Sequence, residues 1–192
     1  MSSDSSIIAA ALVDIENDGD LDVATITQQG LQIIKNLENW DFNDATTSSA
    51  TQAQHAQNQR TLATVDFNLN IQADILLPNG YFENMRHGRF RWQPYPTTVA
   101  TSNDPVAAIA IADADANGSW DSISASDEGI TIAFSRTQAG EKTTITNTSK
   151  ICALETAGIA TWDFDNDGIL DIVAGNIQLP LETGHLVFGT IH

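Results

Sequence analysis

The chain has 192 residues and is 42% hydrophobic, so it can bury a core and is not a disordered acidic segment. Its formal charge of −17, from 25 acidic and 8 basic residues, argues against binding to nucleic acid or to an anionic membrane surface. The sequence contains no run of about 18 apolar residues, so a membrane-spanning helix is not expected. The first residues, "MSSDSS", lack the basic region of a signal peptide. The single cysteine, Cys152, excludes an internal disulfide.

One pattern occurs four times along the chain. Each copy begins with a short apolar segment, at residues 7–13, 62–65, 106–112 and 157–162. A second segment follows at 22–26, 74–78, 121–125 and 171–175, and a third at 30–36, 88–93, 129–135 and 184–190. The segments are short and rich in β-branched and aromatic residues, and Gly, Asn, Asp and Pro separate them, which predicts strands.

An acidic loop lies between the first and second segments of each copy. The loops are "DIENDGDLD", "DFNLNIQAD", "DADANGSWD" and "DFDNDGILD", which start at residues 14, 66, 113 and 163. Acidic or amide residues occupy positions 1, 3, 5 and 9 of each loop, and glycine occupies position 6 of all but the second. The first residues of successive loops are 52, 47 and 50 positions apart, so the chain consists of four repeats of about 50 residues.

Repeated antiparallel sheets with this period predict an all-β fold of the β-propeller type, built from four antiparallel blades. The repeat units are about 6–58, 59–103, 104–152 and 153–192, within a single domain spanning 1–192. Four units leave closure open. The propeller is either a closed four-bladed ring or part of a larger one, completed by a second chain or by further sequence, because open sheet faces and edges are normally covered.

The loop spacing predicts a calcium site. Side-chain oxygens at positions 1, 3, 5 and 9, with the backbone carbonyl of position 7, supply six or seven hard oxygen ligands around one centre. Zn²⁺ would favour His or Cys instead. An EF-hand is excluded because position 12 is Thr25, Leu77, Ser124 or Ala174, and because strands rather than helices flank the loops.

The loops "DIENDGDLD", "DADANGSWD" and "DFDNDGILD", together with the following "GLQIIKNLENWDF" and "GYFENMRHGRF", resemble the FG-GAP/VCBS repeats of integrin-α-type β-propellers. The resemblance covers essentially the whole chain. It implies about three Ca²⁺ ions per chain that brace the blades. The implied ligands are Asp14, Glu16, Asp18, Asp20 and Asp22; Asp113, Asp115, Asn117, Ser119 and Asp121; and Asp163, Asp165, Asp167, Ile169 and Asp171.

Two loops depart from the family pattern. Glu16 is one methylene longer than the usual Asp or Asn, so it is expected to bind obliquely or through water. In the second loop, β-branched Ile71 stands where a positive φ favours glycine. That loop is expected to bind metal weakly or not at all; its ligand positions are Asp66, Asn68, Asn70, Gln72 and Asp74.

The only basic cluster contains Arg86, Arg89, Arg91 and Trp92. It is read either as the charged face of a hairpin or as a patch for an acidic glycan or an acidic protein. No catalytic motif is present, which predicts a protein that is not an enzyme.

We therefore expect a calcium-stabilised module for extracellular recognition, adhesion or assembly, with a protein or glycan partner. The alternatives are a propeller lectin for acidic glycans and the propeller domain of a polysaccharide-degrading enzyme. The need for calcium predicts an extracellular, cell-surface or periplasmic location.

Overall fold

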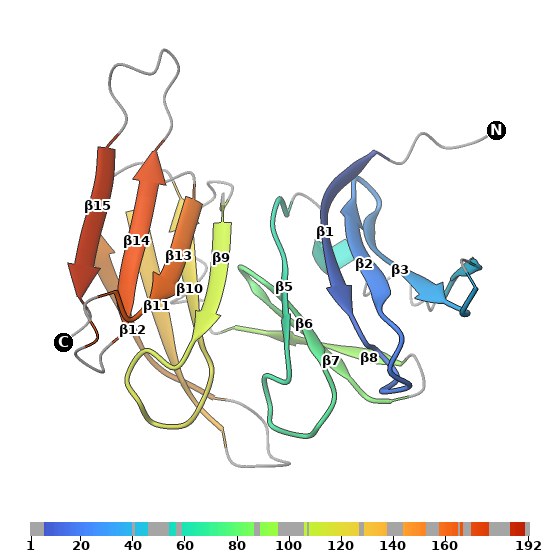
Figure 1. Ribbon diagram of the computed structural model, residues 1–192. Helices are drawn as coiled ribbons and strands as arrows, with labels where there is room; N and C mark the ends of the chain where they lie inside the picture. Colours follow the sequence, from blue (N-terminus) through green and yellow to red (C-terminus); the bar gives the residue numbers. More distant parts are fainter. Residues whose placement is uncertain are drawn as a thin grey trace. The chain divides into compact units, whose positions relative to one another are not determined.

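The structure is a computed structural model, drawn in Figure 1. It describes residues 6–39, 41–45, 54–56, 59–86, 89–95, 106, 108–126, 129–137, 144–152, 158–164, 166, 170–176 and 185–190. The chain divides into two compact units, Met1–Tyr95 and Pro96–His192. Among the described residues, no helix combines the length and the apolar character needed to cross a membrane.

The first unit contains two four-stranded antiparallel sheets. One has the order β1-β2-β3-β4, with bounds Ile7–Val13, Asp22–Thr27, Gly30–Asn36 and Phe42–Asp44. The other has the order β5-β6-β7-β8, with bounds Ala63–Val65, Asp74–Leu77, Gly80–Asn84 and Phe90–Pro94. A short 3₁₀ turn, η1 (Gln54–Ala56), lies between them in the chain. In each sheet every strand pairs with the next one along the chain.

The second unit also contains two antiparallel sheets. The four-stranded one has the order β9-β10-β11-β12, with bounds Ala108–Ala112, Asp121–Ser126, Gly129–Arg136 and Thr144–Cys152. The three-stranded one has the order β13-β14-β15, with bounds Gly158–Trp162, Asp171–Asn176 and His185–Thr190. The prediction of an all-β chain of small antiparallel sheets, one per repeat, is confirmed.

One strand assignment is wrong. The third strand of the second sheet is β7, which begins at Gly80, and the predicted segment 88–93 overlaps the fourth strand, β8. The reason is a tight turn at Pro78 and Asn79, across which Leu77 pairs with Gly80. A side chain at position 80 would also collide with the Trp92 ring and the Gln93 carbonyl, since a Cβ there would lie only 2.6 and 2.5 Å from them.

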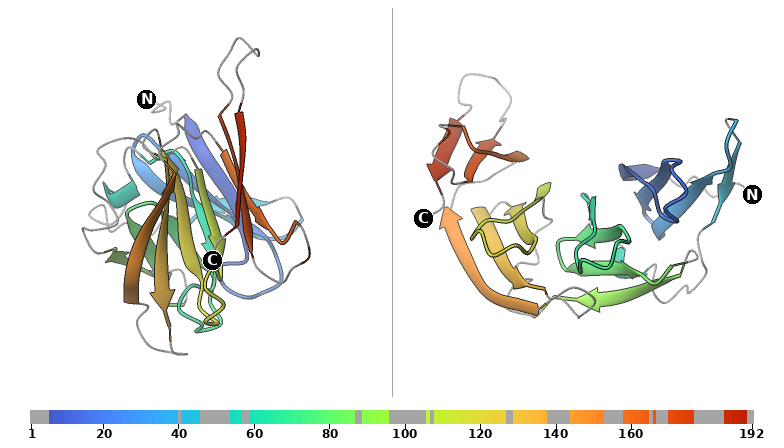
Figure 2. Two further views of the ribbon diagram at one scale, coloured as in Figure 1. Left: turned by 90° about the vertical axis from the view of Figure 1, so that its left-hand side faces the viewer. Right: turned by 60° about the horizontal axis from the view of Figure 1, so that its bottom comes forward.

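Within each unit the two sheets pack through a shared apolar core. In the first unit, Val13, Ala24, Ile26 and Ile33 of one sheet join Ile75, Leu77 and Phe82 of the other. In the second unit, Ile123, Ile130 and Ile132 join Ile172 and Ala174. The first strands also meet, because β1 contacts β5 and β9 contacts β13. Figure 2 shows the first two sheets (blue and green) next to each other in this way, an arrangement typical of blades.

The backbone of the acidic loops repeats as closely as the sheets do. Position 4 is left-handed in all four loops, with φ of 58° at Asn17, 57° at Leu69, 56° at Ala116 and 57° at Asn166. Position 6 is left-handed at Gly19 (94°), Gly118 (82°) and also Ile71 (74°). The second loop therefore adopts the common turn although its β-branched residue is unsuited to it, and Ile71 is exposed, so packing contributes little in return.

We expect Ile71→Gly to stabilise the protein by about 1 kcal/mol, because it removes the left-handed strain of a β-branched residue at a small cost in chain entropy. The converse change, Gly118→Ile, should destabilise by about 1–2 kcal/mol through backbone strain alone, since a Cβ at Gly118 would meet no atom within 4 Å. Denaturant unfolding in EDTA measures both effects. Equal stability of all three proteins would contradict this account of the turn.

Candidate functional site

In the first three loops, the carboxylate at position 1 accepts hydrogen bonds from backbone N–H groups later in the same loop. Asp14 accepts hydrogen bonds from the backbone N–H groups of Asp18 (3.1 Å) and Gly19 (2.9 Å). Asp66 accepts from Asn70 and Ile71, both at 2.8 Å. Asp113 accepts from Asn117 (3.0 Å) and Gly118 (2.8 Å). Positions 5 and 6 are thus held over position 1 in three loops, whichever residues occupy them.

The carboxylate at position 9 ties each loop to its sheet. One oxygen accepts from the N–H of position 2, and the other accepts from the last part of the third strand. Asp22 binds Ile15 (3.1 Å) and Asn36 (2.8 Å) in this way. Asp74 binds Phe67 (3.1 Å) and Asn84 (2.8 Å), and Asp121 binds Ala114 (2.8 Å) and Ser135 (2.7 Å). In the fourth loop, Asp171 accepts from the N–H of Phe164 at 2.9 Å.

The third loop gathers its carboxylates around one point. Asp113, Asp115 and Asp121, at positions 1, 3 and 9, offer oxygen atoms that all lie within 4.8 Å of one another. Within the described part of the chain, no other group of three acidic, His or Cys side chains meets this condition. The amide oxygen of Asn117 accepts from the N–H of Ser119 (2.8 Å), and the amide nitrogen donates to the carbonyl of Ser135 (2.8 Å).

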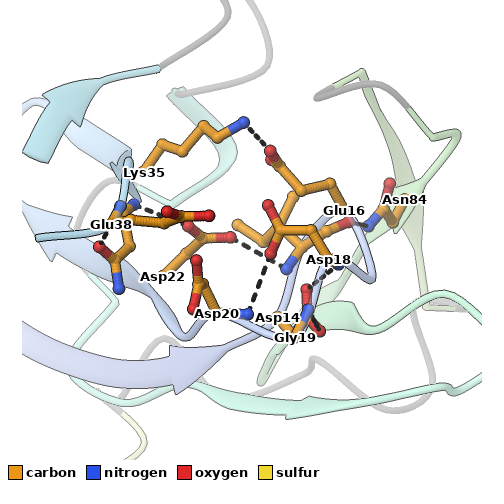
Figure 3. A network of polar contacts seen from close by, with 11 residues as sticks. Asp14, Glu16, Asp18, Gly19, Asp20, Asp22, Lys35, Glu38 and Asn84 are labelled. Atoms are coloured by element: carbon orange, nitrogen blue, oxygen red, sulfur yellow. Dashed lines mark hydrogen bonds and ion pairs between the residues drawn. The ribbon is translucent and has the colours of Figure 1, made fainter.

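The first loop is arranged differently at position 3. Glu16 forms an ion pair with Lys35 of β3, as Figure 3 shows. The extra methylene of Glu16 therefore serves a contact outside the loop centre in this structure. Asp18 at position 5 accepts from the N–H of Asp20 at 3.0 Å, which repeats the bond that Asn117 makes in the third loop.

The second loop keeps the frame with amides. Asn70 accepts from the N–H of Gln72 at 2.8 Å, and the Asn68 amide donates to Glu83 at 3.3 Å. Asn68 is only 3% exposed, and Gln72 is also buried. Of the predicted ligands in the fourth loop, Asp163 and Asp171 are described and lie at its two ends, whereas Asp165, Asp167 and Ile169 lie outside the described residues.

Two amides connect the first and second loops. Asn84 at the end of β7 is 1% exposed and donates to the carbonyls of Ile15 (2.7 Å) and Ala73 (3.2 Å). Asn17 donates to the carbonyl of Ile71 at 2.8 Å. The sequence patterns "GLQIIKN" and "GYFEN" mark Asn36 and its counterpart Asn84 as part of the family resemblance, but they did not predict the contacts of these amides.

Burial shifts the acidity of two position-9 carboxyls. It raises the pKa of Asp121 to about 6 and that of Asp74 to about 7. The backbone N–H bonds that each carboxylate accepts lower its pKa, but burial has the larger effect. Nearby negative charges, Asp115 and Asp113 in one case and Asp66 and Glu83 in the other, raise both pKa values further. A cation in the third loop would offset the repulsion around Asp121.

The basic cluster belongs to the β7–β8 hairpin. Arg91 donates twice to Glu83, at 3.1 and 2.8 Å, from the directly paired position on the neighbouring strand. Trp92 stacks against His55, with ring centroids 4.7 Å apart, and packs against Phe82. The exposed members are Arg86 and Arg89, which flank the hairpin turn, together with the outer part of Arg91.

The comparisons with known proteins concern the fold. No protein-family model matches the chain, and no curated protein matches it either. A solved structure of an Agrocybe aegerita lectin, which recognises non-reducing terminal N-acetylglucosamine, is similar with a TM-score of 0.57 and 16% sequence identity. The similarity covers 86% of this chain but 46% of the lectin chain, so this chain spans about half the length of that neighbour.

Without bound metal, the raised pKa values make stability fall as pH rises. The folded protein binds these protons at a higher pH than the unfolded chain does, so stability is gained as pH falls through about 7 and about 6 toward the unfolded value of 3.8. Thermal melts in EDTA between pH 8 and pH 5 should therefore show a melting temperature that rises toward pH 5.

The net charge of −17 would also make the melting temperature rise toward pH 5, because protonation reduces the repulsion between acidic groups. A variant is therefore needed to separate this cause from the two buried carboxyls. Asp121→Asn should flatten the pH dependence of the melt. Asp41→Asn, which removes one exposed carboxylate, should leave it nearly unchanged. The same slope in both variants would attribute the effect to net charge.

Proposed function

We propose that this chain is a calcium-stabilised, non-enzymatic recognition module built from blade repeats of the FG-GAP/VCBS type. The observation that carries the proposal is the carboxylate group of Asp113, Asp115 and Asp121. Ca²⁺ binds oxygen at about 2.3–2.6 Å, so two ligands of one ion lie within about 5 Å of each other. The 4.8 Å spread of these oxygens fits that limit.

The donor set fits a hard cation as well. Asp113, Asp115 and Asp121 would hold the ion through carboxylates, with the Asn117 amide oxygen and the Ser119 carbonyl completing the set proposed from the family pattern. The ion would supply charge neutralisation rather than reaction chemistry. The residues themselves hold the loop: Asp113 and Asp121 accept four backbone N–H bonds that fix positions 2, 5 and 6 and the end of β11.

Calcium should raise the melting temperature by several degrees over EDTA, because it binds the folded loops and not the unfolded chain. Asp115→Ala should lose much of this gain and one bound ion in native mass spectrometry. In EDTA it should melt no lower than the parent, since Asp115 makes a single long bond, from Asn117 at 3.3 Å, and its charge adds to the repulsion around Asp121. Asp41→Ala is the matched control. Equal melts in calcium and EDTA, with no bound ion, would overturn the proposal.

The first loop should bind calcium more weakly than the third while Lys35 holds Glu16. Lys35→Met releases the carboxylate and removes a positive charge beside the loop. We expect it to increase calcium affinity several-fold at that loop, measured by calorimetric titration in the Asp115→Ala background. An unchanged or lower affinity would mean that Glu16 does not serve as a ligand.

The larger assembly is a further part of the proposal. The repeat pattern and the contacts between first strands support a propeller, either closed by these four sheets or completed by additional blades from a second chain. The chain count from native mass spectrometry distinguishes these forms. Millimolar calcium in the extracellular and periplasmic spaces supports a location there.

Glycan recognition is the second candidate function. The fold-level similarity to a lectin supports it, at an identity that speaks for the fold alone. For the basic cluster, the exposed Arg86 and Arg89 would serve an acidic glycan or an acidic protein. Trp92 contributes less to such a surface, because its ring is stacked under His55.

A further inference from the structure

A cavity of about 530 Å³ opens beside the first acidic loop. It is lined by Asp20, Asn36, Glu38, Asn39 and Phe42. Asp20 comes from position 7 of the loop, Asn36 ends β3, Glu38 and Asn39 form the turn after it, and Phe42 begins β4. The size lies within the range of small-molecule sites, about 300–1,000 Å³, and the site is a shallow, open one, because Glu38, Asn39 and Phe42 are exposed.

The frame of the cavity is fixed by backbone bonds. Leu37 donates to the carbonyl of Asp41 at 2.8 Å, and Asp41 donates to that of Glu38 at 2.9 Å. Both Glu38 and Asn39 are left-handed, with φ of 68° and 52°. The side-chain amide of Asn36 is already hydrogen-bonded to the protein, because it donates to the Leu21 carbonyl (3.3 Å) and accepts from the Glu38 N–H (3.1 Å).

The side chains left over define the chemistry. The carboxylates of Asp20 and Glu38, both labelled in Figure 3, make no hydrogen bond or ion pair with a described residue. Phe42 is 45% exposed and offers an apolar ring. Among the described residues that line the cavity there is no Lys or Arg. The wall thus provides hydrogen-bond acceptors, one primary amide in Asn39, and a flat apolar surface.

We infer that this cavity binds a saccharide that is neutral or carries an amine, and excludes acidic ones. Vicinal hydroxyl or ammonium groups would donate to Asp20 and Glu38, while the apolar face of the pyranose ring packs on Phe42. A sugar carboxylate would meet two like charges in a chain whose formal charge is −17. This inference rests on the proposed recognition function and names its ligand class.

The site also shares a residue with the first acidic loop. The N–H of Asp20 is held by Asp18, whereas its carboxylate lines the cavity. An ion held by that loop would fix Asp20 without touching the saccharide. Saccharide binding should therefore weaken, but not vanish, when calcium is removed.

The test measures the binding of three related probes to the full chain by ligand-observed NMR titration in the presence of calcium. The probes are N-acetylglucosamine, glucosamine and glucuronic acid. We expect the first two to bind and glucuronic acid to bind at least tenfold more weakly. Phe42→Ala and Glu38→Gln should each weaken binding about tenfold, with Glu38→Gln acting more strongly on glucosamine. Phe164→Ala, which truncates another exposed phenylalanine, is the matched control.

Thermal melts of each variant separate loss of the site from loss of the fold, and Glu38→Gln preserves size and shape if Phe42→Ala unfolds. Absence of binding by all three probes, equal binding of glucuronic acid, or binding unchanged by both substitutions overturns the inference. If calcium still raises the melt in that case, the calcium proposal stands without this site. If the saccharide binds but calcium does not change the melting temperature, the site is retained and the calcium proposal is rejected.

Discussion

The carboxylate at position 9 of each loop links three parts of a sheet that are distant in sequence. Asp22, Asp74 and Asp121 each begin a second strand, and each accepts one N–H from the start of the loop and one from the end of the third strand. These carboxylates are buried, so their bonds are made away from competing water. The loop, the first hairpin and the second hairpin therefore keep one geometry in every described repeat.

Burial of this link has an electrostatic cost that depends on the neighbours. In the third loop, Asp113 and Asp115 add negative charge around Asp121, and in the second loop Asp66 and Glu83 do so around Asp74. The first group is the one that brings three carboxylates close enough for a shared cation, whereas the second contains amides at positions 3 and 5. The same frame thus supports two different balances of charge.

Sequence periodicity was sufficient for the all-β class, the four sheets and the positions of the loops, because strand alternation and turn residues are local signals. It misplaced the third strand of the second sheet, because Gly80 and Gly88 each precede a short segment with aromatic residues and only the strand pairing shows that the third strand begins at Gly80. It also could not reveal the Glu16–Lys35 pair, the stacking of His55 on Trp92, or the cavity beside Phe42, which depend on side chains brought together by pairing between strands.

Because backbone N–H groups bonded to the carboxylates at positions 1 and 9 hold the turn, the loops have two separable tasks. Asp66 and Asp74 preserve the shape of the second loop, while Asn68 stands where the other loops carry an acid and Ile71 stands where they carry glycine. Individual repeats are thereby free to diverge at positions 3, 5 and 6 without loss of the sheet. In a tandem array of this design, the number of loops that gather three carboxylates can change without a change in the number of repeats.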